Sequence, residues 1–388
     1  MSRLPAFLFC FVLSSPFGVR AEETELRVFI DEDQGTISAL REDEEKPILT
    51  NHARPDFRPY IHPVVAPDGR GVLTQYSPGH HRHQTGLYWG FTRVNGRDYF
   101  HHPKGDYWQR KSMKVIKDSG ASVQWHTVYD LLDANGKAVL TETQTWEMRA
   151  SSSEYVLDLV WKGTAIIDIT VNRYSYGGLF LRMPWKRGIK GEAVNASGRR
   201  NGAAEGKRDV WVDVGMQVAG RDDLAHIAIF DHPKNKGFPL PWRVDGQLGV
   251  GPVRARLGSW SIEKGESETI RHRFIIYTGD RDDSALNRKW SDYTGLAERP
   301  VTAPSKVTLR PSLPATHPLS LIAKTIGETN DTDIQKDLLR GMLDGLGRRR
   351  NVAPPAGWAE LQKGFAASKD QAIRDLSRKL SQIFGFRE

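Results

Sequence analysis

The chain has 388 residues, a formal net charge of +8 at pH 7 and a single cysteine, Cys10. A chain of this length can bury a core large enough to fold without disulfides. Because the only thiol lies in the N-terminal leader, thiol catalysis and thiolate metal ligands are excluded from the rest of the chain. The basic residues are spread along the sequence, and without a basic stripe nucleic acid is excluded as the expected partner.

Residues 1–21 have the pattern of a signal peptide. Arg3 supplies a basic start, Leu4 to Leu13 are apolar, and Val19-Arg20-Ala21 fits a cleavage site. The apolar run is shorter than the roughly 20 residues that a membrane-spanning helix needs, and no other segment approaches that length. We therefore expect an exported protein, periplasmic or extracellular, with no membrane span in the mature chain.

Residues 22–298 are predicted to form one large antiparallel β-sandwich domain. Strand patterns, with alternating or β-branched and aromatic residues, follow one another from about residue 25 to residue 293. Asn-Gly turns at Asn95-Gly96 and Asn135-Gly136 separate some of them, as in β-hairpins. No helical period of useful length occurs before residue 280. The fold class is therefore mainly β.

Residues 299–318 are rich in proline without a periodic pattern and are predicted to be a linker. Residues 319–388 then change to helical spacing, with an amphipathic run from Ile334 to Leu346 and a capping box at Ser368 and Gln371. This segment is predicted to form two or three packed helices, similar to one HEAT-like repeat unit. It has no catalytic cluster, so we expect a packing module or a site of protein docking.

The densest group of reactive side chains lies in residues 77–91, where three of the chain's 12 histidines fall within four positions. A Pro-Gly turn precedes them and an aromatic strand pattern follows. In an extended segment His81 and His83 point to one face and His80 to the other. Two imidazoles on one face can bind a metal, polarise a substrate or act as acid and base. The alternative is a solvated polar turn.

Further polar segments occur beside turns or at predicted strand ends, where β domains commonly build sites. They are residues 58–63, residues 174–182 and residues 231–235. Together they predict a single pocket at the mouth of the sandwich, although each alone fits an ordinary turn. Most tryptophans are expected in the core, but Trp89, Trp108, Trp185 and Trp242 lie beside loop segments and favour a cleft.

The order of these motifs resembles an exported family known as PmoA-like or "methane oxygenase". The resemblance rests on Arg58-Pro-Tyr-Ile-His-Pro63, on residues 78–90, on Tyr176-Gly-Gly-Leu179 with Arg182, and on Asp231-His-Pro233 with Trp242. It covers roughly residues 25–295. It implies a sandwich similar to galactose mutarotases, a domain of unknown function and a setting in sugar metabolism. The helical tail resembles segments of exported proteins of planctomycete type.

Three functional hypotheses remain open. The leading one is a carbohydrate-active enzyme, an isomerase, lyase or hydrolase that uses acid/base chemistry on a sugar. The alternatives are a non-catalytic glycan-binding domain and a His-dependent metalloenzyme with its metal at His81 and His83; otherwise no cofactor is expected. The predicted catalytic residues are His81, His83, Arg182, Asp231 and His232. The predicted substrate-binding residues are Tyr60, His62, Trp89, Tyr176, Asn235 and Trp242.

Overall fold

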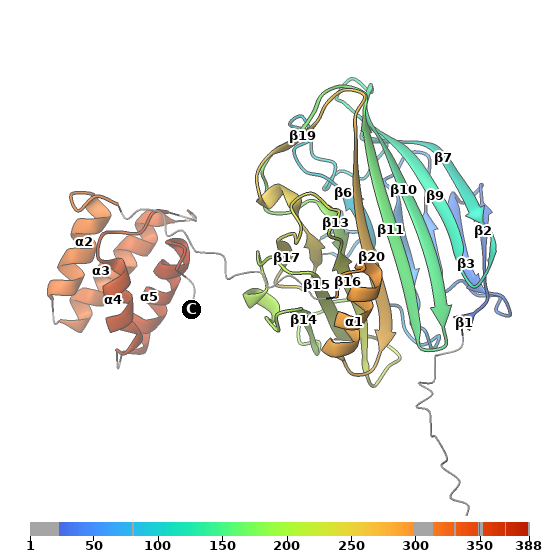
Figure 1. The fold of residues 1–388 in the computed structure, drawn as a ribbon. Helices are drawn as coiled ribbons and strands as arrows, with labels where there is room; N and C mark the ends of the chain where they lie inside the picture. Colours follow the sequence, from blue (N-terminus) through green and yellow to red (C-terminus); the bar gives the residue numbers. More distant parts are fainter. Residues whose placement is uncertain are drawn as a thin grey trace, which may run out of the picture. The chain divides into compact units, whose positions relative to one another are not determined.

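The protein is described by a computed structural model that covers residues 23–79, 81–297, 313–329, 331–347, 349, 352–368 and 370–386. The expected signal peptide, His80 and residues 299–312 of the expected linker lie outside the described residues. The chain divides into two compact units, Met1–Thr302 and Ala303–Glu388 (Figure 1).

The first unit contains two large sheets and one small one, and all their strand pairs are antiparallel. The first sheet has nine strands and includes the long strands that run side by side in Figure 1. In sheet order these are β14 (Gly191–Asn195), β15 (Trp211–Gln217), β16 (Leu224–Asp231), β20 (Ser267–Thr278), β11 (Glu154–Ala165), β10 (Ala138–Ser151), β9 (Val123–Leu132) and β7 (Trp108–Lys117), and β1 (Glu23–Thr24) pairs with β10.

The second sheet also has nine strands. In sheet order they are β17 (Trp242–Val244), β18 (Val250–Pro252), β13 (Gly178–Leu181), β6 (Leu87–Gly90), β5 (Tyr60–Val64), β4 (Leu49–His52), β3 (Thr36–Arg41), β2 (Leu26–Asp31) and β8 (Ser119–Gly120). A small sheet pairs β12 (Ile169–Val171) with β19 (Trp260–Ile262).

The core lies between the two large sheets, because alternate side chains of each strand point inward. Along β10 buried and partly exposed residues alternate, and Trp146 and Met148 belong to the buried set. The stacking of Trp161 of β11 on Trp89 of β6, with ring centroids 5.0 Å apart, joins the two sheets. The predicted mainly β fold, an antiparallel sandwich with a helical C-terminal part, is confirmed.

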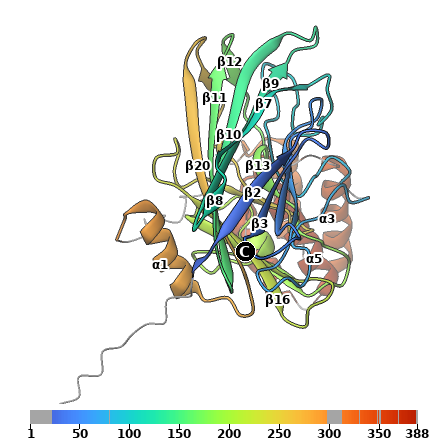
Figure 2. The same ribbon diagram turned by 90° about the vertical axis from the view of Figure 1, so that its right-hand side faces the viewer.

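One helix was not expected in the β domain. Helix α1 (Asp283–Thr294) packs Leu286 and Trp290 against the outer face of the first sheet, on the side turned away from β2 and β3 (Figure 2). Asp282 caps its N-terminus by accepting hydrogen bonds from two backbone N–H groups, and Gly295 ends it with a positive φ of 73°. The prediction of strand structure up to residue 293 was therefore wrong over this helix.

The second unit contains four helices among its described residues. They are α2 (Pro318–Glu328), α3 (Thr332–Leu346), α4 (Trp358–Ala366) and α5 (Gln371–Ile383). Asp370, rather than the predicted Ser368, caps α5 by accepting from the backbone N–H groups of Ala372 and Ile373. Throughout the described parts of the chain, every helix is too short or too polar to span a membrane.

The helical unit has its own core around Trp358, which is 1% exposed and whose indole N–H donates to Ser381 Oγ at 3.0 Å. We expect Trp358→Ala to destabilise this unit by about 3–5 kcal/mol, as is typical when a buried aromatic side chain is removed. In differential scanning calorimetry the transition of the helical unit should move down while that of the β unit stays in place. Leu321→Ala, at a position 52% exposed, is the control. A shift of both transitions with Trp358→Ala would show that the two units do not unfold separately.

Candidate functional site

Strands β5, β6 and β13 place a group of aromatic and histidine side chains on the outer face of the second sheet. Neighbouring residues of a strand point to opposite faces, so Leu87 and Trp89 enter the core while Tyr88 faces outward. The outward cluster consists of Tyr60, Tyr88, Phe100 and Phe180, with Phe57 and Tyr176 packed against it. We call this cluster, together with His62, His81, His83 and His101, the outer His/Tyr face.

The buried guanidinium of Arg58 connects two loops of this face, the one before β6 that contains His83 and the one after β6 that contains Phe100. Arg58 is 0% exposed, and its carbon atom Cζ lies 3.9 Å from the centre of the Tyr88 ring. It donates to the carbonyl oxygen of His83 at 2.7 Å and to that of Phe100 at 2.6 Å. Burial lowers the pKa of Arg58 to about 10, so it is charged at neutral pH.

Gly90 allows the second loop to pass this close to the sheet. A Cβ atom at Gly90 would lie 2.8 Å from the Tyr99 carbonyl oxygen and 3.2 Å from the Arg58 guanidinium. Any larger residue would therefore push away the backbone that Arg58 binds.

The loops bring together His83, His101 and Asp98. The ring centroids of His83 and His101 are 4.4 Å apart, and His81 lies 5.7 Å from His83. His101 Nδ1 bonds Asp98 Oδ2 at 2.7 Å, and the same carboxylate accepts the backbone N–H groups of Phe100 and His101. Although burial raises the pKa of Asp98, these hydrogen bonds lower it below its usual value, so the carboxylate is ionised and orients the His101 ring.

Tyrosines border the histidines on both sides. Tyr176 OH lies 3.4 Å from His101 Nε2 and 3.4 Å from Tyr174 OH. On the other side, the ring of Tyr76, which is 42% exposed, lies 5.3 Å from that of Tyr60 and 6.0 Å from that of His62. The face therefore offers half-exposed rings and hydroxyl groups around the His83–His101 pair.

Two histidines of this face, His83 and His62, have lowered pKa values. Burial, followed by the charges of His101 and Arg58, lowers the pKa of His83 to about 3. Burial, followed by His52, lowers the pKa of His62 to about 4, and His62 Nδ1 lies 2.9 Å from Thr74 Oγ1. Both imidazoles are neutral at pH 7. Each can accept one hydrogen bond and donate another without carrying a charge.

Arg182 stabilises the loop of this face that contains His83. It is 0% exposed, and its guanidinium bonds Asp245 at 2.7 Å, Gln84 at 2.5 Å and the carbonyl oxygen of Gln247 at 2.5 Å. Gln84 is the neighbour of His83 in the chain. Since its donors are occupied within the protein, Arg182 is not placed for the catalytic role that the sequence predicted.

Three of the tryptophans expected in a cleft are core residues. Trp89 and Trp242 are 2% and 0% exposed, and Trp108 is buried in the same core. The indole N–H of Trp242 donates to the Asp209 carbonyl oxygen at 2.8 Å. The prediction that Trp89 and Trp242 bind substrate was wrong, because both rings are buried in the core. Trp185 alone of the four is partly buried.

Asp231, His232 and Asn235 do not join the outer His/Tyr face. Asp231 is at the end of β16 in the first sheet and accepts from Asn235 Nδ2 and from the backbone N–H of Leu240. The ring of His232 packs against Tyr293 of α1, on the outer side of the first sheet. The expected single pocket is therefore wrong: the two groups lie on different sheets, and Asp231 and Asn235 hold a loop in place.

Among the described residues, no group of three or more His, Cys, Asp or Glu side chains could hold a metal ion. The metalloenzyme hypothesis thus gains no support from His81 and His83.

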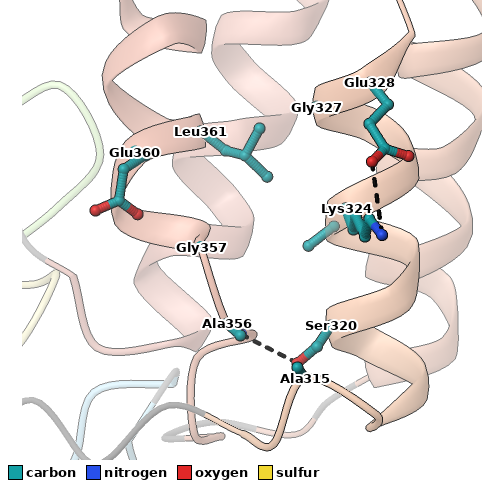
Figure 3. Close-up of a pocket in the computed structure, with 10 residues that line it drawn as sticks. Ala315, Ser320, Lys324, Gly327, Glu328, Ala356, Gly357, Glu360 and Leu361 are labelled. Atoms are coloured by element: carbon teal, nitrogen blue, oxygen red, sulfur yellow. Dashed lines mark hydrogen bonds and ion pairs between the residues drawn. The ribbon is translucent and has the colours of Figure 1, made fainter.

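The helical unit contains a mostly apolar cavity of about 400 Å³ between α2 and α4 (Figure 3). Leu361 of α4 points toward Gly327 of α2, and Lys324 and Glu328 form an ion pair at its edge. Nothing in the described residues of this unit identifies a protein that would occupy it. Docking through this unit stays a prediction without support.

The fold and this face define a mainly β sandwich protein with a polar, aromatic surface on one sheet. Residues 43–291 match the family of unknown function DUF6807. The chain therefore belongs to that family. The resemblance to the PmoA-like family is corrected by this match, because DUF6807 is a different family. No match was found among curated proteins.

Several solved structures have distant likenesses to the chain. The GH36 α-galactosidase AgaB from Geobacillus stearothermophilus is 9% identical, with a TM-score of 0.34, over 66% of this chain and 41% of that one. The galactosidase domain of the α-galactosidase-sucrose kinase AgaSK is 10% identical, with a TM-score of 0.36, over 65% and 42%. The Slr1438 protein from Synechocystis sp. PCC 6803 is 9% identical, with a TM-score of 0.28, over 70% and 99%.

The chain thus spans 41% of the length of α-galactosidase AgaB. At these TM-scores the likenesses support no conclusion about function.

Sequence reasoning missed Asp98 and His101 as members of the site. Their spacing contained a signal, since an Asp three residues before a His can accept both a backbone N–H and the imidazole N–H in a turn. It also missed the role of Arg58, because a buried arginine bound to carbonyl oxygens has no sequence pattern of its own.

Replacing Arg58 tests its part in this arrangement. We expect Arg58→Met to lower the free energy of unfolding by about 2–6 kcal/mol, since two carbonyl oxygens lose their donor at roughly 1–3 kcal/mol each. Urea unfolding measures this change. Arg54→Met, at an exposed neighbouring position where the guanidinium covers Phe57, should change stability by less than about 0.5 kcal/mol. Equal effects of the two variants would contradict the role of Arg58.

The protonation of His83 provides a second test. Its folded pKa of about 3 lies below the usual value, so the ring should remain neutral from pH 8 to pH 5 in NMR spectra of the imidazole nitrogens. In the urea-unfolded chain the pKa of the same ring should be about 6.5. Because the unfolded chain binds this proton more readily, His83 contributes stability above pH 6.5 that is lost as the pH falls toward 3. A folded-state midpoint near 6.5 would contradict the burial described here.

Proposed function

We propose that the outer His/Tyr face binds a carbohydrate and performs acid/base chemistry on it. The observation that supports this most is the Asp98–His101–His83 group, in which one imidazole is oriented by a carboxylate and the other is neutral. Tyr76 and Tyr176, rather than Trp89 and Trp242, stack on the substrate, since partly exposed tyrosine rings can lie against a sugar ring.

The two imidazoles have different roles in this proposal. His101, oriented through Nδ1 by Asp98, has its Nε2 atom 3.4 Å from Tyr176 OH and exchanges a proton through Nε2 with a sugar hydroxyl group or carbon that takes the place of this contact. The carboxylate stabilises the imidazolium that forms. His83 remains neutral and donates a hydrogen bond to a ring or carbonyl oxygen of the sugar, where negative charge develops. His81, His62 and Tyr60 border this position.

We also propose that the protein acts outside the cytoplasm. The support is the signal-peptide pattern of residues 1–21. N-terminal sequencing of the mature protein should find Glu22 as the first residue. An unprocessed Met1 in the protein from its native cell would contradict export through this signal.

Substitutions of the imidazole–carboxylate pair test the catalytic part. After a sugar that the protein turns over is identified by screening, we expect His101→Ala and Asp98→Asn to lower turnover by about 10²–10⁴-fold, the usual contribution of a general acid or base. His102→Ala is the matched control, because His102 is the exposed neighbour and stacks on Tyr107 instead.

The melting temperatures of these variants separate lost chemistry from lost folding. Sugar binding without turnover by the parent protein would favour the glycan-binding alternative. Equal turnover by the parent protein and His101→Ala would overturn the catalytic assignment.

A further inference from the structure

Arg93 has an unusual backbone conformation for an arginine. Its φ is 53°, in the left-handed region that residues with long side chains rarely adopt. It lies three residues after the end of β6, in the loop that leads to Asp98. A residue held in such a conformation is strained, and strained residues are concentrated at binding sites. Glycine or asparagine would fit this position with less strain, so an arginine here points to a role for its side chain.

The guanidinium of Arg93 is stacked on a tyrosine and open to solvent. Its Cζ atom lies 4.3 Å from the centre of the Tyr174 ring, and Arg93 is exposed. Stacking uses the flat face of the guanidinium, while its N–H donors point outward in the plane of the group. Within the part of the chain that the structure describes, no carboxylate forms an ion pair with Arg93. The tyrosine therefore positions a cation whose donors can reach a ligand.

A series of ring contacts connects Arg93 to the imidazoles of the outer His/Tyr face. The centre of the Tyr174 ring lies 4.8 Å from that of Tyr176, which lies 5.5 Å from that of His101. The distance between Arg93 and His101 cannot exceed the total of these steps. An oligosaccharide of a few units can therefore contact both residues.

Main-chain contacts fix Arg93 beside this pair of tyrosines. The backbone N–H of Asn172 donates to the Arg93 carbonyl oxygen at 3.2 Å. One residue earlier in the same loop, Thr92 Oγ1 donates to the Tyr176 carbonyl oxygen at 3.1 Å. The loop after β6 is thus bound to the segment before β13 on both sides of Tyr174. The position of Arg93 relative to the tyrosines is therefore set by the fold.

Further arginines make this end of the outer His/Tyr face basic. The Cζ atom of Arg243 lies 6.0 Å from the centre of the Tyr176 ring, and Arg256 donates to the carbonyl oxygen of the residue before Tyr176 at 2.6 Å. Both arginines bond the same carboxylate, Glu205, at 3.0 Å and 2.5 Å. Together with Arg93, the cations of this group outnumber its carboxylate. Grouped cations at a surface attract an anionic ligand.

We propose that Arg93 binds a carboxylate or sulfate group of the ligand, so that the carbohydrate of this protein is an acidic oligosaccharide. This inference rests on the proposed carbohydrate site at the outer His/Tyr face. The planar fork of a guanidinium matches two oxygen atoms of either group with paired hydrogen bonds. The acidic unit lies at Arg93, and the neighbouring units pass Tyr174 and Tyr176 toward His101.

Calorimetric titration with defined trisaccharides tests this assignment. The probes are trimers of galacturonate, of mannuronate, of glucuronate and of sulfated galactose, each paired with its methyl ester or its unsulfated form. We expect at least one acidic trimer to bind about tenfold or more tightly than its uncharged counterpart, as for a hydrogen bond to a charged group. Whether that trimer is a uronate or a sulfate identifies the acidic group. Arg93→Met should remove this preference.

Arg93→Asn separates the binding role from a structural one. Asparagine adopts a positive φ more readily than arginine, so the urea midpoint of this variant should equal or exceed that of the parent. Its preference for the acidic trimer should be lost, as in Arg93→Met. A lower urea midpoint with an unchanged preference would show that the arginine only stabilises the loop, and would overturn the assignment.

Arg54→Met is the matched control, because Arg54 is also exposed and stacks on an aromatic ring, with its Cζ atom 4.5 Å from the centre of Phe57. It should keep the preference of the parent. Equal binding of charged and uncharged trimers would overturn this inference alone, whereas no binding of any trimer would also overturn the proposed function. His101→Ala should keep the preference and lose turnover, which distinguishes failure of the catalytic proposal from failure of the Arg93 site.

Discussion

The buried guanidinium of Arg58 is the constraint on which the outer His/Tyr face depends. Its donors reach the carbonyl oxygens of the two loops on either side of β6, at His83 and at Phe100. A charge in this position is costly unless its hydrogen bonds are satisfied. The loops therefore keep their carbonyl groups turned inward and their imidazole rings turned toward each other. Without this cation the loops would lose the hydrogen bonds that keep the ring centroids of His83 and His101 4.4 Å apart.

The same cation also contributes to the protonation of His83. Burial is the main cause of the lowered pKa of His83, and the positive charge of Arg58 adds to it by disfavouring a second positive charge. On the other side of the pair, the Asp98 carboxylate orients the ring of His101 through Nδ1. One carboxylate and one buried cation thus distinguish two adjacent imidazoles, which is the condition for giving them separate roles in proton transfer.

Much of the fold was predictable because strand alternation is a local signal. β10 and β11 have the expected period of two, and the helical spacing after residue 319 corresponds to real helices. Helix α1 was missed since its core contact depends on only two buried side chains, Leu286 and Trp290. Its capping residues, Asp282 and Gly295, were the available signal.

The site was only partly predictable because a sequence does not say which sheet a strand joins. His83 and His232 both lie in turn-like segments next to a strand. However, β6, which follows His83, belongs to the second sheet, and β16, which precedes His232, belongs to the first. Trp89 looked like a cleft residue from its neighbours, but its alternation with Tyr88 places it in the core. Arg58 acts through the backbone carbonyl groups of His83 and Phe100, 25 and 42 residues away, and such contacts exist only once both loops are folded.

Histidine-selective NMR during titration with the sugars that bind tests whether the carbohydrate lies on the outer His/Tyr face. We expect the ring signals of His83 and His101 to shift to saturation with the ligand while those of His232, on the other sheet, stay unchanged. Shifts at His232 with unchanged signals from His83 and His101 would contradict it.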